Sequence, residues 1–209
     1  MRLKNKVVGI CGGSGSGKTY LLNLLTARLG DRVCVLSQDH YYKALELQEK
    51  DSQGQVNFDL PSAIDEKRFV HDLDCLINGH QIQVKEYTFN NPAVRPRSLL
   101  LKPAPIIIVE GLFIFHCQAI RERLSLKVFI EADETLALER RLERDIDERA
   151  YTREMILYQW KNHVMPAYER FLLPYRDNAD LFVHNEGGNN PAIETLPDIE
   201  ALLNNLDSI

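Results

Sequence analysis

Residues 12–19 carry the clearest chemical signal in the chain, because glycines, a lysine and a hydroxyl occur at a fixed spacing. Glycines let backbone N–H groups turn inward and hold phosphate oxygens. The lysine of such a loop can reach the β- and γ-phosphates of a nucleotide, and the threonine hydroxyl can ligate Mg²⁺. A strand-like run before the loop and a helical run after it argue against an ordinary glycine-rich turn. The pattern GxxxxGK[ST] is met by Gly12, Gly13, Ser14, Gly15, Ser16, Gly17, Lys18 and Thr19.

Two carboxylates follow apolar runs and are expected at the same edge of a sheet as this loop. Glu110 comes directly after the run 106–109, where an acid is suited to a metal-bound water. Asp39 follows the run 33–36, where it could accept the proton of an acceptor hydroxyl and help to hold Mg²⁺. The alternatives are an acid that starts a loop and a polar loop residue. With the phosphate loop present, we predict a metal site of Thr19, Asp39 and Glu110.

Arginines and aromatic residues form two further groups of candidates. Arg141 and Arg144 are three apart and share one helical face. A solvated helix laced with ion pairs is the alternative, since acidic residues are interleaved and each such pair contributes only ~0.3–0.5 kcal/mol. The phosphate loop favours a catalytic function for the arginines. The aromatic residues could belong to the core, but they fall outside the central strands, which favours a pocket formed by Tyr41, Tyr42, Phe58, Tyr87 and Phe89.

The elements that must position these residues alternate between strands and helices, which is typical of a parallel α/β sheet covered on both faces. Gly30 is placed to end the first helix, and Pro166 to kink or end the last one. A short antiparallel pair, 81–87 with 98–101, is expected outside the main sheet. The predicted strands are 7–11, 33–36, 106–109, 127–130 and 181–183, and the predicted helices are 18–29, 64–78, 133–149 and 152–171.

Composition sets the class of protein. The chain has 209 residues, of which 44% are hydrophobic and 26% charged, so it is globular and supports a sizeable core. A net charge of −5 argues against a general nucleic-acid binder. The longest apolar run, 106–109, is far short of a membrane span, and the four cysteines form no CxxC pair. We therefore expect a cytoplasmic protein with reduced thiols, without nucleic-acid or membrane partners.

Motifs spread along nearly the whole chain resemble the uridine kinase family of P-loop kinases, relatives of phosphoribulokinase. The run 140–149, with the pattern Arg-Arg-x-x-Arg-Asp-Ile-x-Glu-Arg, is the most family-specific of them. The resemblance implies a single P-loop kinase domain over 1–209, with a β flap at 81–101 and a helical lid near 141–165 that close over the acceptor. Closure would exclude water, which competes as an acceptor. The matching segments are 12–19, 36–42, 57–61, 87–89, 109–111, 140–149 and 166–168.

The resemblance also implies roles for individual residues. Asp39 matches the residue that acts as the base for a nucleoside 5′-hydroxyl. Lys18 matches the lysine that reaches the phosphate being transferred. Arg144 and Arg149 resemble lid arginines that neutralise the transferring phosphoryl group, and one such arginine can contribute ~10³ or more in rate. A loop at 185–190 is expected near the adenine, and the family often forms oligomers. The expected nucleoside contacts are Tyr42, Phe58, Asp59, Tyr87, Phe89, Arg141 and Gln159.

Two positions depart from the family pattern. Pro92 stands where the family has a histidine that hydrogen-bonds the pyrimidine edge, although Asn90 or Asn91 could substitute. Tyr151 stands where the family has a second arginine. The leading hypothesis is transfer of a phosphoryl group from ATP (or GTP), with Mg²⁺, to the 5′-hydroxyl of uridine or cytidine. The alternatives are the same chemistry on another small alcohol, such as a phosphorylated sugar or a vitamin precursor, and a non-catalytic nucleotide-binding regulatory module.

Overall fold

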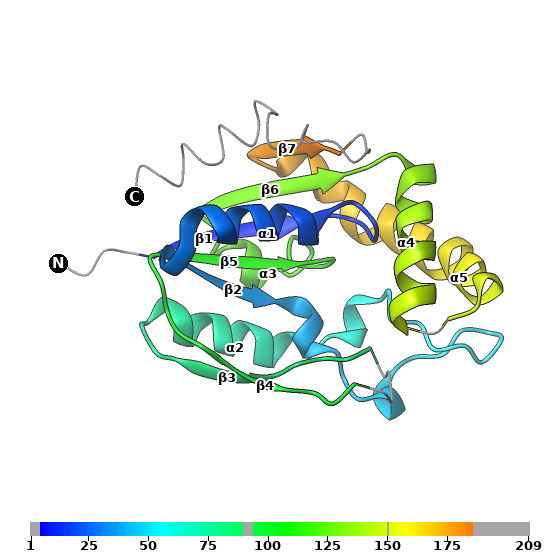
Figure 1. Ribbon diagram of the computed structural model, residues 1–209, viewed down its shortest axis with the longest axis horizontal. Helices are drawn as coiled ribbons and strands as arrows, with labels where there is room; N and C mark the ends of the chain where they lie inside the picture. The colour runs from blue at the N-terminus through cyan, green and yellow to red at the C-terminus, as the bar shows by residue number, and fades with distance from the viewer. Residues whose placement is uncertain (1–4, 90–93, 150, 186–209) are drawn as a thin grey trace.

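The computed structural model describes residues 5–89, 94–149 and 151–185. Its centre is a five-stranded sheet in the order β2-β5-β1-β6-β7, in which all neighbouring strands are parallel (Figure 1). The central strands are almost wholly buried, as expected of a parallel sheet covered on both faces. The sheet confirms the predicted α/β fold. The strands are β1 (Lys6–Cys11), β2 (Val33–Ser37), β5 (Ile106–Gly111), β6 (Leu126–Glu131) and β7 (Leu181–His184).

Helices cover both faces of the sheet. On one face α1 packs Leu21, Leu25 and Leu29 onto alternate residues of β1, β5 and β6. On the other face α2 packs Phe69, Leu73 and Leu76. Gly30 ends α1 with a positive φ of 56°, as the sequence predicted, and the Asp65 side chain caps α2. The helices are α1 (Lys18–Leu29), α2 (Glu66–Ile77), α3 (Gln118–Arg121), α4 (Glu134–Arg149), α5 (Arg153–Gln159) and α6 (Met165–Ala167).

The predicted helix 152–171 is helical throughout but not regular. The segment Trp160–Val164 is π-helical, α6 follows, and Tyr168–Leu172 is π-helical again before the 3-10 segment Leu173–Asn178. Of the two outcomes predicted for Pro166, a kink or an end, the end is wrong, because helical backbone continues to Leu172. A wider turn directly before Pro166 interrupts the regular bonding that a proline would otherwise break.

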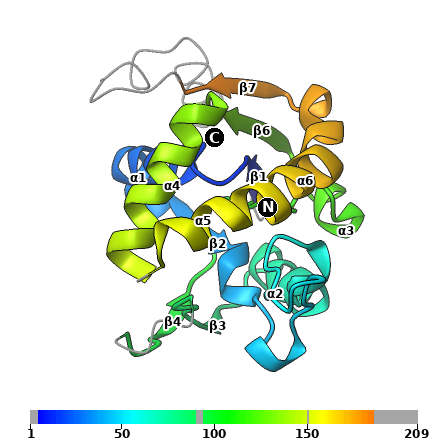
Figure 2. The same ribbon diagram turned by 90° about the vertical axis from the view of Figure 1, so that its right-hand side faces the viewer.

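The antiparallel pair lies outside the main sheet, as predicted. Strands β3 (Ile82–Lys85) and β4 (Ser98–Leu101) form their own two-stranded sheet, which lies beside α2 and β2 in Figures 1 and 2. Ile82 and Val84 are buried against the core, whereas the alternate residues are exposed. The pair therefore has one anchored face, and the chain that leaves β3 runs towards the carboxyl ends of the main strands.

Two further expectations concern the cysteines and the membrane. All four cysteines are free, and Cys11 and Cys34 are buried, as expected of small core residues. Within the described residues, no helix combines the length and the apolar character that a membrane span requires.

Candidate active site

The phosphate-binding loop joins β1 to the N-terminus of α1, as the motif requires. Gly15 and Gly17 have φ values of 76° and 99°, and a Cβ atom at Gly15 would lie 2.2 Å from the carbonyl oxygen of Ala137. Glycine is therefore needed for both backbone shape and space. No side chain caps the N-terminus of α1, so its backbone N–H groups are free to meet an anion. Lys18 Nζ donates hydrogen bonds to the carbonyl oxygens of Gly12 (2.7 Å) and Gly13 (2.9 Å).

Two residues from distant elements brace this loop. Asn185, just after β7, donates from Nδ2 to the carbonyl oxygen of Ser16 over 2.9 Å. Arg140, on α4, donates to Asn185 Oδ1 (3.1 Å) and to the carbonyl oxygen of Gly15 (3.2 Å). The family resemblance places Asn185 in a loop near the adenine and implies no role for Arg140. Residues 186–190 of that loop lie outside the described residues.

Glu110 and Asp39 meet the phosphate loop at the carboxyl ends of β5 and β2. Glu110 pairs in register with Ser37, and Asp39 follows two residues later, so both line one cleft with Lys18 and Thr19. Burial, and then the negative charge of Asp39, raise the pKa of Glu110 to about 7, although Lys18 acts in the opposite direction. Burial likewise lowers the pKa of Lys18, against the attraction of the two carboxylates.

The oxygen atoms at this point fit a magnesium ion. Glu110 is buried, and two crowded carboxylates repel each other unless a cation lies nearby. Mg²⁺ prefers oxygen ligands and takes one or two carboxylates together with substrate phosphates and water. Consistent with so few protein ligands, the described residues contain no cluster of three or more histidine, cysteine or acidic side chains suited to a metal. Thr19, Asp39 and Glu110 would hold the ion here.

Replacing Glu110 with glutamine is expected to stabilise the metal-free protein above pH 7 and to lower its activity. The folded pKa lies above the ordinary value of 4.5, so the charged form destabilises the folded state as pH rises from about 4.5 to 7. A pKa shift of this size corresponds to roughly 3 kcal/mol, or a rise in Tm of about 5–10 °C at pH 8. Thermal unfolding of both proteins at pH 4 and pH 8 measures this.

Glu46→Gln, on the exposed segment Leu45–Leu47, is the matched control and should change neither Tm nor activity. If the difference in Tm between Glu110→Gln and the original protein were the same at pH 4 and pH 8, the charged form of Glu110 would not destabilise the folded state.

A cluster of aromatic rings lines the cleft opposite the phosphate loop. Tyr42 lies 5.0 Å from Tyr87 and 5.9 Å from Phe58 between ring centroids, and Tyr87 lies 5.1 Å from Phe89. Phe89 has a φ of 53°, and no other non-glycine residue in the described ranges has a positive φ. Strained backbone of this kind is concentrated at functional sites. Tyr41, by contrast, is buried in the core, so the prediction that it belongs to the pocket is wrong.

One buried carboxylate orders three arginines of α4. Asp145 is fully buried and forms ion pairs with Arg144 (2.8 Å), Arg141 (3.2 Å) and Arg149 (3.2 Å). Asp145 belongs to the motif 140–149, but the family resemblance implies no role for it. The available signal was its spacing, since Asp145 lies four residues from both Arg141 and Arg149. These arginines therefore face the protein and not the solvent, which removes the solvated-helix alternative.

The arginines connect the two sides of the cleft. Arg141 donates to Ser14 Oγ (3.2 Å) and to Gln159 Oε1 (3.0 Å), and Arg144 lies 3.5 Å from the same Ser14 oxygen. The guanidinium carbon of Arg149 lies 3.7 Å from the centroid of the Phe89 ring. Phosphate loop, arginines and aromatic rings thus form one continuous surface.

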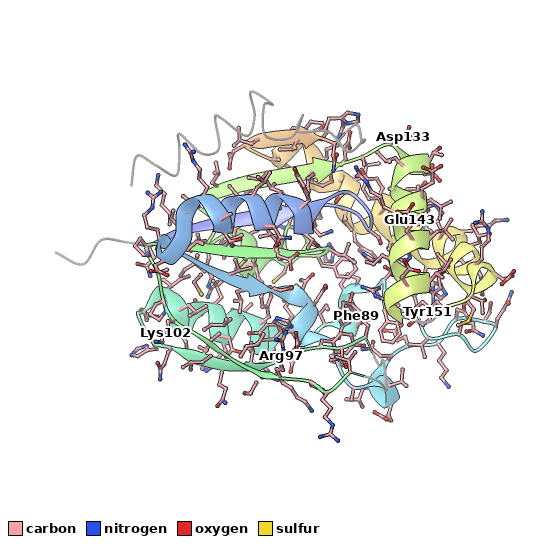
Figure 3. The ribbon with its side chains drawn as sticks, viewed as in Figure 1. Phe89, Arg97, Lys102, Asp133, Glu143 and Tyr151 are labelled. Carbon is pink, nitrogen blue, oxygen red and sulfur yellow. The ribbon has the colours of Figure 1, made fainter. Side chains whose placement is uncertain are left out.

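The cleft has an empty volume of about 880 Å³ and brings most predicted site residues together. Phe89 and Tyr151 lie near the end of α4 where the chain turns towards α5 (Figure 3). Pro92, the other departure from the family pattern, lies outside the described residues. No motif in the sequence points to Val56, Leu112 or His163, which also line the cleft. The predicted residues in its wall are Ser14, Lys18, Thr19, Asp39, Tyr42, Phe58, Asp59, Tyr87, Phe89, Glu110, Arg141, Arg144, Arg149 and Gln159.

A parallel sheet with a phosphate loop, two carboxylates at the strand ends and arginines over the loop defines a P-loop kinase. The model of the phosphoribulokinase / uridine kinase family matches residues 7–190. The chain belongs to this family, so it is an enzyme that uses a nucleotide as its phosphate donor.

Individual relatives agree with this assignment. A uridine kinase from Staphylococcus epidermidis is 34% identical over 191 residues, which cover 91% of this chain and 92% of the relative. A uridine kinase from Borrelia duttonii is 37% identical over 191 residues, with the same coverage. Among solved structures, a possible uridine kinase from Bacillus stearothermophilus has a TM-score of 0.62 at 19% identity, covering 88% of this chain and 90% of that one. The phosphoribulokinase from Rhodobacter spheroides has a TM-score of 0.65 at 17% identity, covering 87% and 70%.

Proposed function

We propose that this chain transfers the γ-phosphoryl group of ATP (or GTP) to the 5′-hydroxyl of a pyrimidine nucleoside, uridine or cytidine. One observation carries the proposal: Asp39 lies in a single cleft between the phosphate loop and the aromatic cluster of Tyr42, Tyr87 and Phe89. Flat rings of this kind suit a nucleobase, which stacks on aromatic faces. Relatives that are 34% and 37% identical to this chain are named uridine kinases.

The residues of the cleft have different roles in the proposed reaction. Asp39 accepts the proton of the attacking hydroxyl, as a general base must. Lys18 and the N-terminus of α1 hold the phosphates in line with that hydroxyl. Arg144 and Arg149 stabilise the charge that develops on the transferring group, and Asp145 keeps their guanidinium groups in position. Thr19, Asp39 and Glu110 would hold Mg²⁺, which would neutralise charge on the phosphate oxygens when bound.

Closure of the cleft completes the proposal. We assign the flap to 81–101 and the lid to 141–165, which contribute Phe89 and Arg149 to opposite sides of one contact. When flap and lid meet over the acceptor, they exclude water from the phosphoryl group.

The test is release of ADP from ATP and Mg²⁺ against a panel of nucleosides, sugars and sugar phosphates, with product masses confirmed. We expect turnover on uridine or cytidine and a product heavier by one phosphoryl group at the 5′ position. Turnover confined to other members of the panel would overturn the choice of acceptor. Tyr151, which departs from the family pattern, would then mark the change to a different acceptor. ATP binding without turnover on any member would favour the regulatory module.

A further inference from the structure

His163 is a cleft residue to which the family motifs assign no function. It lies on the π-helical segment Trp160–Val164, four residues after Gln159. Its side chain is 2% exposed, yet it forms part of the cleft wall. Short π-helical segments are frequent at functional sites. A histidine at this place has two ring nitrogens, and the contacts of each decide what the residue can do.

The first ring nitrogen is held by Asp51. His163 Nε2 lies 2.7 Å from Asp51 Oδ2, and the Tyr158 hydroxyl donates to the same oxygen over 2.7 Å. The other oxygen of Asp51 accepts hydrogen bonds from the backbone N–H groups of Gln53 and Gln55. The hydrogen bond from Tyr158, followed by that from His163, keeps the pKa of Asp51 well below its usual range. Asp51 is therefore a carboxylate, and the proton of the ring is placed on Nε2.

The second ring nitrogen is left for another partner. In the described part of the chain, no residue forms a hydrogen bond with Nδ1 of His163. With its proton on Nε2, a neutral imidazole presents Nδ1 as a hydrogen-bond acceptor. Nδ1 is not among the fully buried side-chain atoms that lack a hydrogen-bond partner, so it is accessible to a donor from a molecule bound in the cleft that His163 lines.

The neighbours of His163 indicate which part of the acceptor comes close. Gln159 and Arg141 are bonded to each other in the same wall. The loop that carries Asp51 continues to Asp59, which is buried and also lines the cleft. This wall is polar, whereas the rings that suit a nucleobase belong to the separate cluster of Tyr42, Tyr87 and Phe89. The hydrogen-bond donors that suit such a wall are hydroxyl groups of the acceptor.

We propose that His163 binds the acceptor by accepting a hydrogen bond from a sugar hydroxyl, and that Asp51 positions its ring. This inference rests on the proposed function, since it takes a nucleoside as the acceptor. His163 would then contribute to discrimination between sugars, because a site built to pair a hydroxyl binds an analogue without it less well.

The test compares His163→Phe with the unmodified protein on uridine, 2′-deoxyuridine and 3′-deoxyuridine. Phenylalanine keeps the ring and removes both nitrogens. We expect kcat/KM for uridine to fall about tenfold, which is typical of a lost hydrogen bond, with KM for ATP unchanged. The variant should show no further loss on the deoxy analogue that lacks the contacted hydroxyl. His163→Gln, which can still donate to Asp51 and accept from a hydroxyl, should recover part of the uridine activity.

Lys161→Gln is the matched control, because Lys161 is exposed on the same π-helical segment and is not part of the cleft wall. It should keep the uridine kinetics. Two results would overturn the inference. One is an equal loss of kcat/KM in His163→Phe on all three nucleosides, and the other is a loss in the control as large as in His163→Phe. Either result would mean that His163 only holds the loop of Asp51 against the helix. Failure of the unmodified protein to phosphorylate uridine or cytidine would instead overturn the proposed function, and with it the acceptor that this inference assumes.

Discussion

Replacing Asp39 with asparagine is expected to lower kcat by about 10²–10⁴-fold while ATP continues to bind. The amide has almost the same shape as the carboxylate but cannot take up the proton of the attacking hydroxyl. Asp39 also contributes negative charge beside Glu110, so its removal should lower the pKa of that neighbour and leave the metal position with one carboxylate. Release of ADP with uridine gives kcat, and calorimetry without acceptor gives the affinity for ATP.

Asp31→Asn makes the same chemical change at an exposed position after α1 and serves as the control for Asp39→Asn. It should keep normal turnover. If Asp39→Asn retained most of the activity, Asp39 would not be the base. If ATP affinity in the presence of Mg²⁺ fell together with kcat, Asp39 would act mainly as a metal ligand.

Local patterns in the sequence predict the fold and one half of the site. The run 106–109 is buried because only a central parallel strand accommodates four consecutive β-branched residues, and this places Glu110 at the end of the strand. The glycines of the phosphate loop are dictated by backbone shape and space within a few residues. Such features depend on neighbours along the chain, and they were predicted correctly. The bounds of the regular helices were predicted with only small shifts at their ends.

Contacts between distant segments were not predictable in the same way. Asp51 is 112 residues from His163, and nothing in either local sequence marks them as partners. Arg140 and Asn185 meet only because β7 ends and α4 begins beside the phosphate loop. Asp145 sits in a charged run that resembles a solvated helix, and its burial follows from packing that the spacing alone does not specify. At Pro166 the sequence predicted a kink or an end, and helical backbone with π-helical turns on both sides continues past it.

Arg144→Ala is expected to lower kcat by about 10³-fold and to change KM for ATP far less. Arg144 lies at the junction of the site, with its Nε 2.8 Å from Asp145 and a terminal nitrogen 3.5 Å from Ser14 of the phosphate loop. An interaction that strengthens as charge develops on the transferring group acts on the transition state more than on bound ATP. Steady-state kinetics with uridine and ATP, each varied in turn, separate the two effects.

Arg153→Ala is the control for Arg144→Ala, since Arg153 is exposed at the start of α5, within the segment proposed as the lid, and is not part of the cleft wall. It should leave both constants unchanged. Arg144→Lys keeps the charge but not the planar fork that joins Asp145 to the phosphate side, so it should recover only a minor part of kcat. Full recovery by lysine would mean that charge alone matters and that the Asp145 contact is dispensable. A rise in KM for ATP without a fall in kcat would make Arg144 a residue of nucleotide binding, and the charge of the transferring group would then be stabilised by Lys18 and Arg149.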